Sequence, residues 1–402
     1  MGSVAPLDVY VDRAEQTISV GVREMACRLN CDSKNFDRTA ENLARAAQIF
    51  ASGETLRDLI ENEGRQVLKA QQAGTLPLAW SAADCKTEPA ADAPTATASP
   101  ASQDAATPIR LFLGSDDVMV PTASPASQDA ATPTRLYLGS DGVMVPMVTA
   151  EEKQKRRQKI KDKRRRRGKK AKPLPAAKPG ADQKYKEFKI VAFYDETQEH
   201  RLVAGTKGDC VQAGRLMRRQ AARIHFDKAD EKIGNVDGSP WIRNQIKGQN
   251  LPLDALGLDF YHLAENVHKA RRVIHGEEDE SGKTWAGDIL HAFKHEGYEP
   301  AWTKLLGWRT SLRGSKKRSA ADTLLGYVSE RHDMIRYPEF LKKNWQIGSG
   351  PTEATCKTLT GRLKGSGKRW DAGNAEGIMA LEALRQSGLW KAYWQTLLPK
   401  AA

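Results

Sequence analysis

The feature that most constrains the fold is a run of short apolar segments that alternates with helical patterns between residues 134 and 262. Strands are predicted where β-branched and aromatic residues follow one another, and helices where apolar residues recur every three or four positions. The predicted order is strand, strand, strand, helix, strand, helix, strand. The predicted strands are 136–145, 188–194, 200–204, 232–236 and 255–260, and the predicted helices are 208–226 and 241–246. We therefore expect an α/β fold built on a mixed sheet.

This order is that of the ribonuclease H type of fold. There, carboxylates from the first strand, from the end of the fourth strand and from a late helix meet at one edge of the sheet. Asp141 lies within the first predicted strand, Asp237 ends the fourth, and Glu353 lies on a helix that begins near Pro351. Such carboxylates can hold two Mg²⁺ (or Mn²⁺) ions for phosphoryl transfer. The sequence therefore predicts these three residues as catalytic and metal-binding.

Each acidic residue also has a purely structural interpretation. Asp141 precedes a glycine, as in a common turn dipeptide, although its apolar neighbours place it inside a strand, where Asp is unfavourable without a purpose. Asp237 can belong only to a strand-to-helix turn in which the Asp or the following Ser is the cap, and Glu353 can be a capping glutamate. Asp259 follows the fifth strand and is an alternative to Asp237 as the second ligand. His262 is expected to be a packed histidine rather than a ligand.

Helical patterns flank this α/β core, whose first part is 134–262. Residues 263–345 are predicted as a helical insertion, and residues 346–402 complete the core with the helix of Glu353 and further C-terminal helices. Residues 1–85 are predicted as an all-helical domain. Two of its helices, 36–50 and 55–70, are joined by a short turn that contains a capping residue and a glycine, the outline of a helix-turn-helix. An ordinary small helical bundle also explains this pattern.

Basic residues gather in one block. The formal charge is +13, and residues 153–172 account for all of it, since fourteen of them are Lys or Arg and one, Asp162, is acidic. Such a block suits a polyanion such as DNA, or it is a solvated part of a linker over 151–183. A loop that contains two glycines, 362–370, offers further cations and a tryptophan that is expected to stack on a base. The candidate DNA-binding residues are Arg57, Arg65, Lys69, Arg164, Arg165, Arg166, Arg167, Lys364, Lys368, Arg369 and Trp370.

An internal duplication precedes the first strand. Residues 97–121 and 122–146 are 25 residues each and are identical at 22 positions. They differ as Ile109/Thr134, Phe112/Tyr137 and Asp117/Gly142. Residues 86–133 are rich in Ala, Pro, Ser, Thr and Asp, and we expect a mostly disordered linker. The duplication therefore supplies two near-identical candidates for one strand of the sheet.

Composition excludes other classes of protein. No stretch approaches the ~18 apolar residues of a membrane span, and the first fifteen residues lack the basic-then-apolar run of a signal peptide. The five cysteines are scattered and odd in number, which is typical of a reduced cytosolic protein rather than a disulfide scaffold. We therefore expect a cytoplasmic protein without a membrane partner.

Several motifs together resemble one known family. They are GSDGVMVP (139–146), DGSPWI (237–242), LDFYH (258–262), GSGPTEATCK (348–357) and RLKGSGKRW (362–370). They are similar to the DDE transposases of bacterial insertion sequences, ISKra-type, over residues 15–85 and 134–390. The resemblance implies a ribonuclease H-like catalytic domain with a helical insertion, an N-terminal DNA-binding region, and Mg²⁺-dependent cleavage and joining of DNA at element ends.

The resemblance also implies a site and partners. The triad maps to Asp141, Asp237 and Glu353, and Asp237 is preferred over Asp259 because related families place the second Asp in a DG motif after the fourth strand. The partners are double-stranded DNA, as inverted-repeat ends and as target, and further copies of the chain in a homo-oligomer. The location is the bacterial cytoplasm, at the nucleoid.

Two other functions remain open. The sequence departs from the family pattern at 86–133, where an extra copy carries Asp116-Asp117 in place of Asp141-Gly142. If that copy competes for the sheet, the chain is a catalytically inactive DNA-binding derivative. A nuclease acting on RNA–DNA hybrids is the third interpretation.

Overall fold

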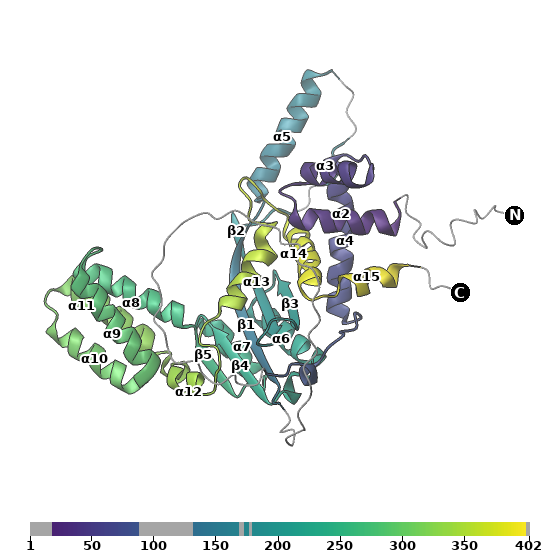
Figure 1. The fold of residues 1–402 in the computed structure, drawn as a ribbon. Coiled ribbons are helices and arrows are strands. Elements are labelled where there is room, and N and C mark those ends of the chain that lie inside the picture. The colour runs from purple at the N-terminus through teal and green to yellow at the C-terminus, as the bar shows by residue number, and fades with distance from the viewer. Residues whose placement is uncertain (1–17, 88–131, 169–172, 177–178, 399–402) are drawn as a thin grey trace, which may run out of the picture.

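The computed structural model describes residues 18–87, 132–168, 173–176 and 179–398. Within these residues the chain forms fourteen α-helices and one five-stranded mixed sheet (Figure 1). The predicted α/β architecture is confirmed. The strands are β1 (Arg135–Pro146), β2 (Tyr185–Tyr194), β3 (Arg201–Thr206), β4 (Glu231–Val236) and β5 (Ala255–Leu258).

The strand order across the sheet is β3-β2-β1-β4-β5. β2 pairs antiparallel with both β1 and β3, whereas β1, β4 and β5 run parallel to one another. β1 is central, with Leu138 opposite Phe193 on one side and Gly234 on the other. β5 ends at Leu258, two residues before its predicted end, because Asp259 caps the helix that begins at Phe260.

Helices cover both faces of the sheet. Side chains alternate between the faces along a strand, so Lys189 and Phe193 point to one face and Ile190 to the other. On the first face, Lys189 lies over Trp241 of α7 (Pro240–Gly248), and α6 (Cys210–Arg223) packs against β2 and β3. The opposite face carries α13 (Gly350–Gly361) and α14 (Ala372–Gln386), which pack on β1 and β3.

The N-terminal helices pack directly on this core. They are α2 (Val20–Asp32), α3 (Phe36–Ala47) and α4 (Gly53–Ala73). α4 crosses α14 where Gly64 meets Gly377, and a Cβ added at Gly64 would lie 2.6 Å from the Gly377 carbonyl oxygen. Because only hydrogen atoms separate the two backbones here, the helices approach more closely than larger residues allow. Buried residues of the N-terminal helices and of the sheet belong to one continuous hydrophobic core.

The segment between β5 and α13 is helical, as the sequence predicts, and lies to one side of the sheet (Figure 1). It begins slightly earlier than predicted, at Phe260. Its helices are α8 (Phe260–His275), α9 (Glu280–His291), a π-helical turn (Ala292–Glu296), α10 (Tyr298–Ser311), α11 (Ser315–Ser329), a 3₁₀ turn (His332–Met334) and α12 (Tyr337–Lys342). A last helix, α15 (Trp390–Leu397), follows α14 and packs on α2.

The basic block begins as a helix, where the sequence predicts a linker. α5 (Ala150–Arg166) projects away from the sheet, and none of its residues is buried (Figure 1). A capping box starts it: the Thr149 hydroxyl accepts from the Glu152 amide, and the Glu152 carboxylate accepts from the Thr149 amide, each at 3.2 Å. Acidic residues lie in its first turn and four basic residues in its last, which suits the helix dipole. Local capping, together with ion pairs from Glu152 to Arg369 and from Lys153 to Asp371, therefore holds this helix without a buried face.

The second copy of the duplicated segment supplies β1, and the first copy lies outside the described residues. Two of the three differences between the copies fall inside β1. The Tyr137 hydroxyl accepts a hydrogen bond from the Gln346 amide at 3.2 Å, which a phenylalanine cannot do. A Cβ at Gly142 would lie 1.9 Å from Glu187 Oε1, so an aspartate there would set two carboxylates against each other. Both differences favour the second copy as the strand.

The described residues on either side of the first copy lie next to each other. The Thr87 amide donates to the Pro133 carbonyl oxygen at 2.9 Å, and Lys86 and Thr134 form an antiparallel bridge. The stability of the core should therefore depend little on the number of residues between these points, since each doubling of a loop's length costs only ~0.6 kcal/mol.

We expect deletion of residues 97–121 to leave the free energy of unfolding within about 1 kcal/mol of the full chain, because the contact of Thr87 with Pro133 can close a shorter segment at little difference in cost. Chemical denaturation followed by circular dichroism measures this. Deletion of residues 122–146 is the matched control, since the resulting chain has the same length and differs at three positions. It should be less stable by about 1–3 kcal/mol, because an aspartate then faces Glu187. Equal stability of the two deletions would contradict this account of β1.

Candidate carboxylate site

Three acidic residues from remote segments lie at neighbouring elements of the fold. Asp141 lies within β1 opposite Ile190, Asp237 directly follows β4, and Glu353 lies in the first turn of α13. β1 and β4 are parallel with Leu138 opposite Gly234, so Asp141 and Asp237 lie three residues further along their chains, at the same level. Burial raises the pKa of Asp141, and the negative charges of Asp237 and Glu353 raise it further. The charges of Asp237 and Glu353 therefore both act on Asp141.

The position of Glu353 depends on a glycine in β1. A Cβ at Gly139 would lie 1.8 Å from Thr352 Oγ1, so α13 can touch the strand only where a side chain is absent. This contact fixes the first turn of α13 beside Asp141. The carboxylate of Glu353 itself stays largely in solvent, with 57% of its side chain exposed.

Asp141 and Asp237 are oriented by local hydrogen bonds. The Gly142 amide donates to Asp141 Oδ1 at 2.6 Å, which lowers the pKa of Asp141 against the effect of burial. Asp237 accepts from the Ser239 amide at 2.8 Å and from the Ser239 hydroxyl at 2.6 Å. Asp237 therefore also shapes the turn before α7, as its structural interpretation predicts.

Asp259 belongs to the same cluster but is more fully committed to the fold. It is completely buried and caps α8, accepting from the Tyr261 amide at 2.6 Å. It also accepts from the amide of Ser349 at 2.9 Å and from the Ser349 hydroxyl. One ligand atom each of Asp259, His262 and Glu353 lie within 4.8 Å of one another. These bonds tie the end of β5 to the start of α13.

Two residues of this site were not predicted from the sequence. His262 Nε2 lies 3.9 Å from Glu353, and its positive form lowers the pKa of Asp141, so it faces the carboxylates rather than the core. Arg331, between α11 and α12, lies against the turn after Asp237: a Cβ at Gly238 would be 2.6 Å from Arg331 Nε. No local pattern marks Arg331, because only the packing of the helical insertion brings it here.

The surroundings of Arg331 keep it in place. Its guanidinium lies 4.1 Å from the centre of the Tyr327 ring, and its Nη1 donates to the Tyr327 carbonyl oxygen at 3.0 Å. Burial raises the pKa of Tyr327 to about 12, with a contribution from the charges of Asp237 and Asp259. Arg331 Nε is buried and has no hydrogen-bond partner within the described residues.

The predicted base-stacking role of Trp370 does not fit the structure. Trp370 is 6% exposed, its Nε1 donates to the Leu363 carbonyl oxygen at 3.0 Å, and its ring meets Phe36 edge-on. The aromatic signal in this loop is therefore a core contact with the N-terminal helices. Lys364 is exposed, while Arg369 pairs with Glu152 at 3.1 Å. Burial lowers the pKa of Lys368 to about 8.

The other candidate DNA-binding residues have mixed surroundings. Arg57 pairs with Glu54 and Asp58 on the surface of α4. Arg65 donates to Asn374 of α14 at 2.9 Å, so it belongs to the contact between the two helices, whereas Lys69 is exposed. In the basic block, Arg165, Arg166 and Arg167 are exposed at the end of α5, and Arg164 beside them is partly buried.

A second cluster with metal-ligand chemistry lies at the β2–β3 hairpin, from Cys85, Asp195 and His200. Asp195 already accepts from His200 Nδ1 at 2.8 Å, from the Thr197 hydroxyl at 3.2 Å and from the His200 amide at 3.3 Å. Burial raises the pKa of the Cys85 thiol to about 12, so the thiolate that a metal needs is disfavoured. These contacts close the hairpin.

Comparisons with protein families and with curated proteins found no match. None of the helices that the structure describes has the length and apolar character needed to cross a bilayer.

We expect Asp141→Asn to raise the free energy of unfolding of the metal-free protein at neutral pH. The folded-state pKa of Asp141 is raised, so the folded state binds more protons than the unfolded state between the two pKa values, and stability falls as pH rises through that interval. At neutral pH the whole penalty is present, and it vanishes near pH 4 and below, close to the unfolded pKa of about 3.9.

Thermal unfolding in EDTA at pH 7 and at acid pH measures this difference. Glu199→Gln is the control, since this exposed carboxylate lies away from the cluster and its substitution should change little at either pH. A lower stability of Asp141→Asn at pH 7 would contradict the described electrostatics.

Proposed function

We propose that the chain is a DDE-type DNA transposase with a ribonuclease H-like catalytic domain. The observation that carries the proposal is the placement of Asp141, Asp237 and Glu353, which come from a central strand, the end of its parallel neighbour and the first turn of a late helix that packs on the central strand. The strand order β3-β2-β1-β4-β5 also supports it, since this mixed order with β1 in the centre suits the ribonuclease H type of sheet.

The donor set fits divalent magnesium or manganese. All three side chains offer carboxylate oxygens, which hard cations prefer, and their like charges oppose one another when no cation is present. Two ions held by Asp141, Asp237 and Glu353 would activate the attacking oxygen and stabilise the leaving one. Asp259, held by Ser349 and Tyr261, would support this set rather than belong to it.

The chain's own groups prepare the site. The Gly142 amide and Ser239 hold the carboxylates of Asp141 and Asp237 in fixed orientations. Arg331 places a cation beside the turn that follows Asp237, where it would offset negative charge that develops on a phosphate. The attacking groups are water for cleavage and then the freed 3′-hydroxyl for joining, so no covalent intermediate with the protein forms.

The DNA would be bound by the exposed basic end of α5, by Lys364 and by the N-terminal helices. Because two element ends must be held at once, the active form would be a homo-oligomer on inverted-repeat ends and target DNA. The protein would act in the bacterial cytoplasm, at the nucleoid. The second candidate, a catalytically inactive DNA-binding derivative, rests on the extra copy at 97–121 and is separated from the first by cleavage.

The test is cleavage of duplexes taken from the DNA that flanks the coding sequence, with Mn²⁺ or Mg²⁺. We expect breaks with 3′-hydroxyl ends, and a loss of at least about a hundredfold in Asp141→Asn, Asp237→Asn and Glu353→Gln. Binding of the same duplex should persist, because these side chains attract no phosphate by themselves.

Three results would contradict the proposal or part of it. Binding without breaks would favour the inactive derivative, and cleavage of RNA–DNA hybrids without preference for element ends would favour a hybrid nuclease. Loss of cleavage in Asp259→Asn but not in Asp237→Asn would show that Asp259, rather than Asp237, is the second metal ligand. Glu199→Gln serves as the control and should cleave normally.

A further inference from the structure

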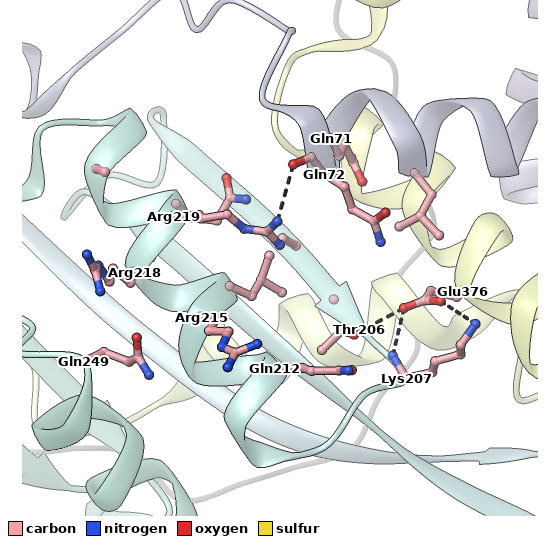
Figure 2. A pocket seen from close by; sticks show the side chains of 16 residues that line it. Gln71, Gln72, Thr206, Lys207, Gln212, Arg215, Arg218, Arg219, Gln249 and Glu376 are labelled. Atoms are coloured by element: carbon pink, nitrogen blue, oxygen red, sulfur yellow. Dashed lines mark hydrogen bonds and ion pairs between the residues drawn. The ribbon is translucent and has the colours of Figure 1, made fainter.

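A basic cavity lies at the open edge of the sheet, away from the carboxylates. Its volume is about 800 Å³, and it is enclosed by α4, α6, the end of β3 and the start of α14 (Figure 2). β3 is the edge strand, so no further strand covers this side. The cavity therefore opens where the sheet ends.

One wall of the cavity is a row of arginines on α6. Arg215 lies three residues before Arg218 and four before Arg219, so it neighbours each of them on the surface of the helix, and all three are exposed. Arg219 donates to the Gln72 carbonyl oxygen at 3.3 Å, whereas Arg215 and Arg218 have no hydrogen bond or ion pair with any described residue. Figure 2 shows the three side chains extending from α6.

The single acidic residue of the lining does not neutralise this row. Glu376 is 4% exposed and accepts from the Lys207 amide at 3.1 Å and the Thr206 hydroxyl at 3.2 Å, and it pairs with Lys207 Nζ at 3.0 Å (Figure 2). The charge of Glu376 is therefore paired with Lys207 and does not neutralise the arginines of α6. Glutamine amides, such as Gln71 and Gln212, supply further hydrogen-bond donors without charge. Positive charge that is not paired within the protein suits phosphate oxygens.

The cavity lies on the same level of the sheet as the proposed catalytic site. Ile190 of β2 is paired with Asp141 on one side and with Gly205, which lines the cavity, on the other. Two strand spacings separate Asp141 from Gly205, about 10 Å. The α6 arginines lie on the face of the sheet opposite α13, so a duplex that contacts both the carboxylates and these arginines must pass round the open edge at β3.

We propose that this cavity binds the sugar-phosphate backbone of double-stranded DNA where the duplex passes the open edge of the sheet. The inference rests on the proposed function for the identity of the polyanion, and on the α6 arginines for the place of contact. Contacts of this kind position a duplex without reading its sequence. The arginine row therefore determines affinity and its salt dependence rather than the choice of element end.

The test uses the full chain in EDTA, so that no cleavage occurs, and a random-sequence duplex in fluorescence anisotropy. Arg215→Gln/Arg218→Gln removes two exposed cations that make no contact with described residues. Each phosphate contact contributes about 0.9 to the slope of log K against log salt. We expect the slope to fall by about 1–2 and affinity to fall roughly tenfold at intermediate salt.

The matched control is Arg313→Gln/Lys391→Gln, which removes the same charge from two exposed positions elsewhere and should retain the wild-type slope. A slope in the α6 variant equal to that of the control would overturn the inference. Loss of inorganic triphosphate binding with unchanged duplex binding would overturn it too, in favour of a small anion.

Failure of this inference and failure of the proposed function are distinguishable. Cleavage by the wild-type chain together with an unchanged slope in the α6 variant would contradict only the inference that the cavity binds DNA. A reduced slope without any cleavage under Mn²⁺ would support the cavity as a DNA contact and contradict the proposed transposase reaction.

Discussion

The structure depends on one carboxylate held inside the central strand of the sheet. Asp141 lies in the central strand and is paired with Ile190 of β2, and burial and two neighbouring negative charges all disfavour its ionised form. A chain gains nothing in stability from this arrangement. The cost is small if the carboxylate is bound by cations in the working protein, because the opposing charges then become ligands. This conflict between stability and charge is the physical reason to regard the cluster as a functional site.

The rest of the fold brings partners to this carboxylate. The parallel pairing of β1 and β4 places Asp237 level with it, and the close contact of Gly139 with Thr352 places the first turn of α13 beside it. The helical insertion contributes Arg331 from the opposite side of the turn at Gly238. The contacts at Gly139 and Gly238 are possible only because these residues have no side chain. The site is therefore assembled by packing rather than by a local motif.

The N-terminal helices are part of the same packing. The sequence outline of a helix-turn-helix presents α4 as a helix with a free face, yet α4 crosses α14 through Gly64 and uses Arg65 in that contact. Trp370 likewise joins the loop after α13 to Phe36 of α3. The helices nearest the N-terminus thus support α13 and α14, the two helices that cover one face of the sheet. If these helices contact DNA, they do so as part of the same packed unit as the sheet.

The sequence by itself determined the elements and the candidate carboxylates. The alternation of apolar residues predicted all five strands to within one or two residues at most ends, since each strand buries its side chains in a regular pattern. It also marked Asp141, because an aspartate among buried apolar residues is visible as an exception. The helix of the basic block was missed, since its capping box and charge order stabilise it without the apolar stripe that marks other helices.

Only the tertiary structure decided how these elements meet. Which duplicated copy forms β1 depends on what Gly142 and Tyr137 face, and neither Glu187 nor the Gln346 amide can be identified as their neighbour from the sequence. Arg331 and His262 join the carboxylates, and the α6 arginines line a cavity, through contacts between segments far apart in the chain. Periodicity reports which side of an element is buried, but it carries no information about which other element covers that side.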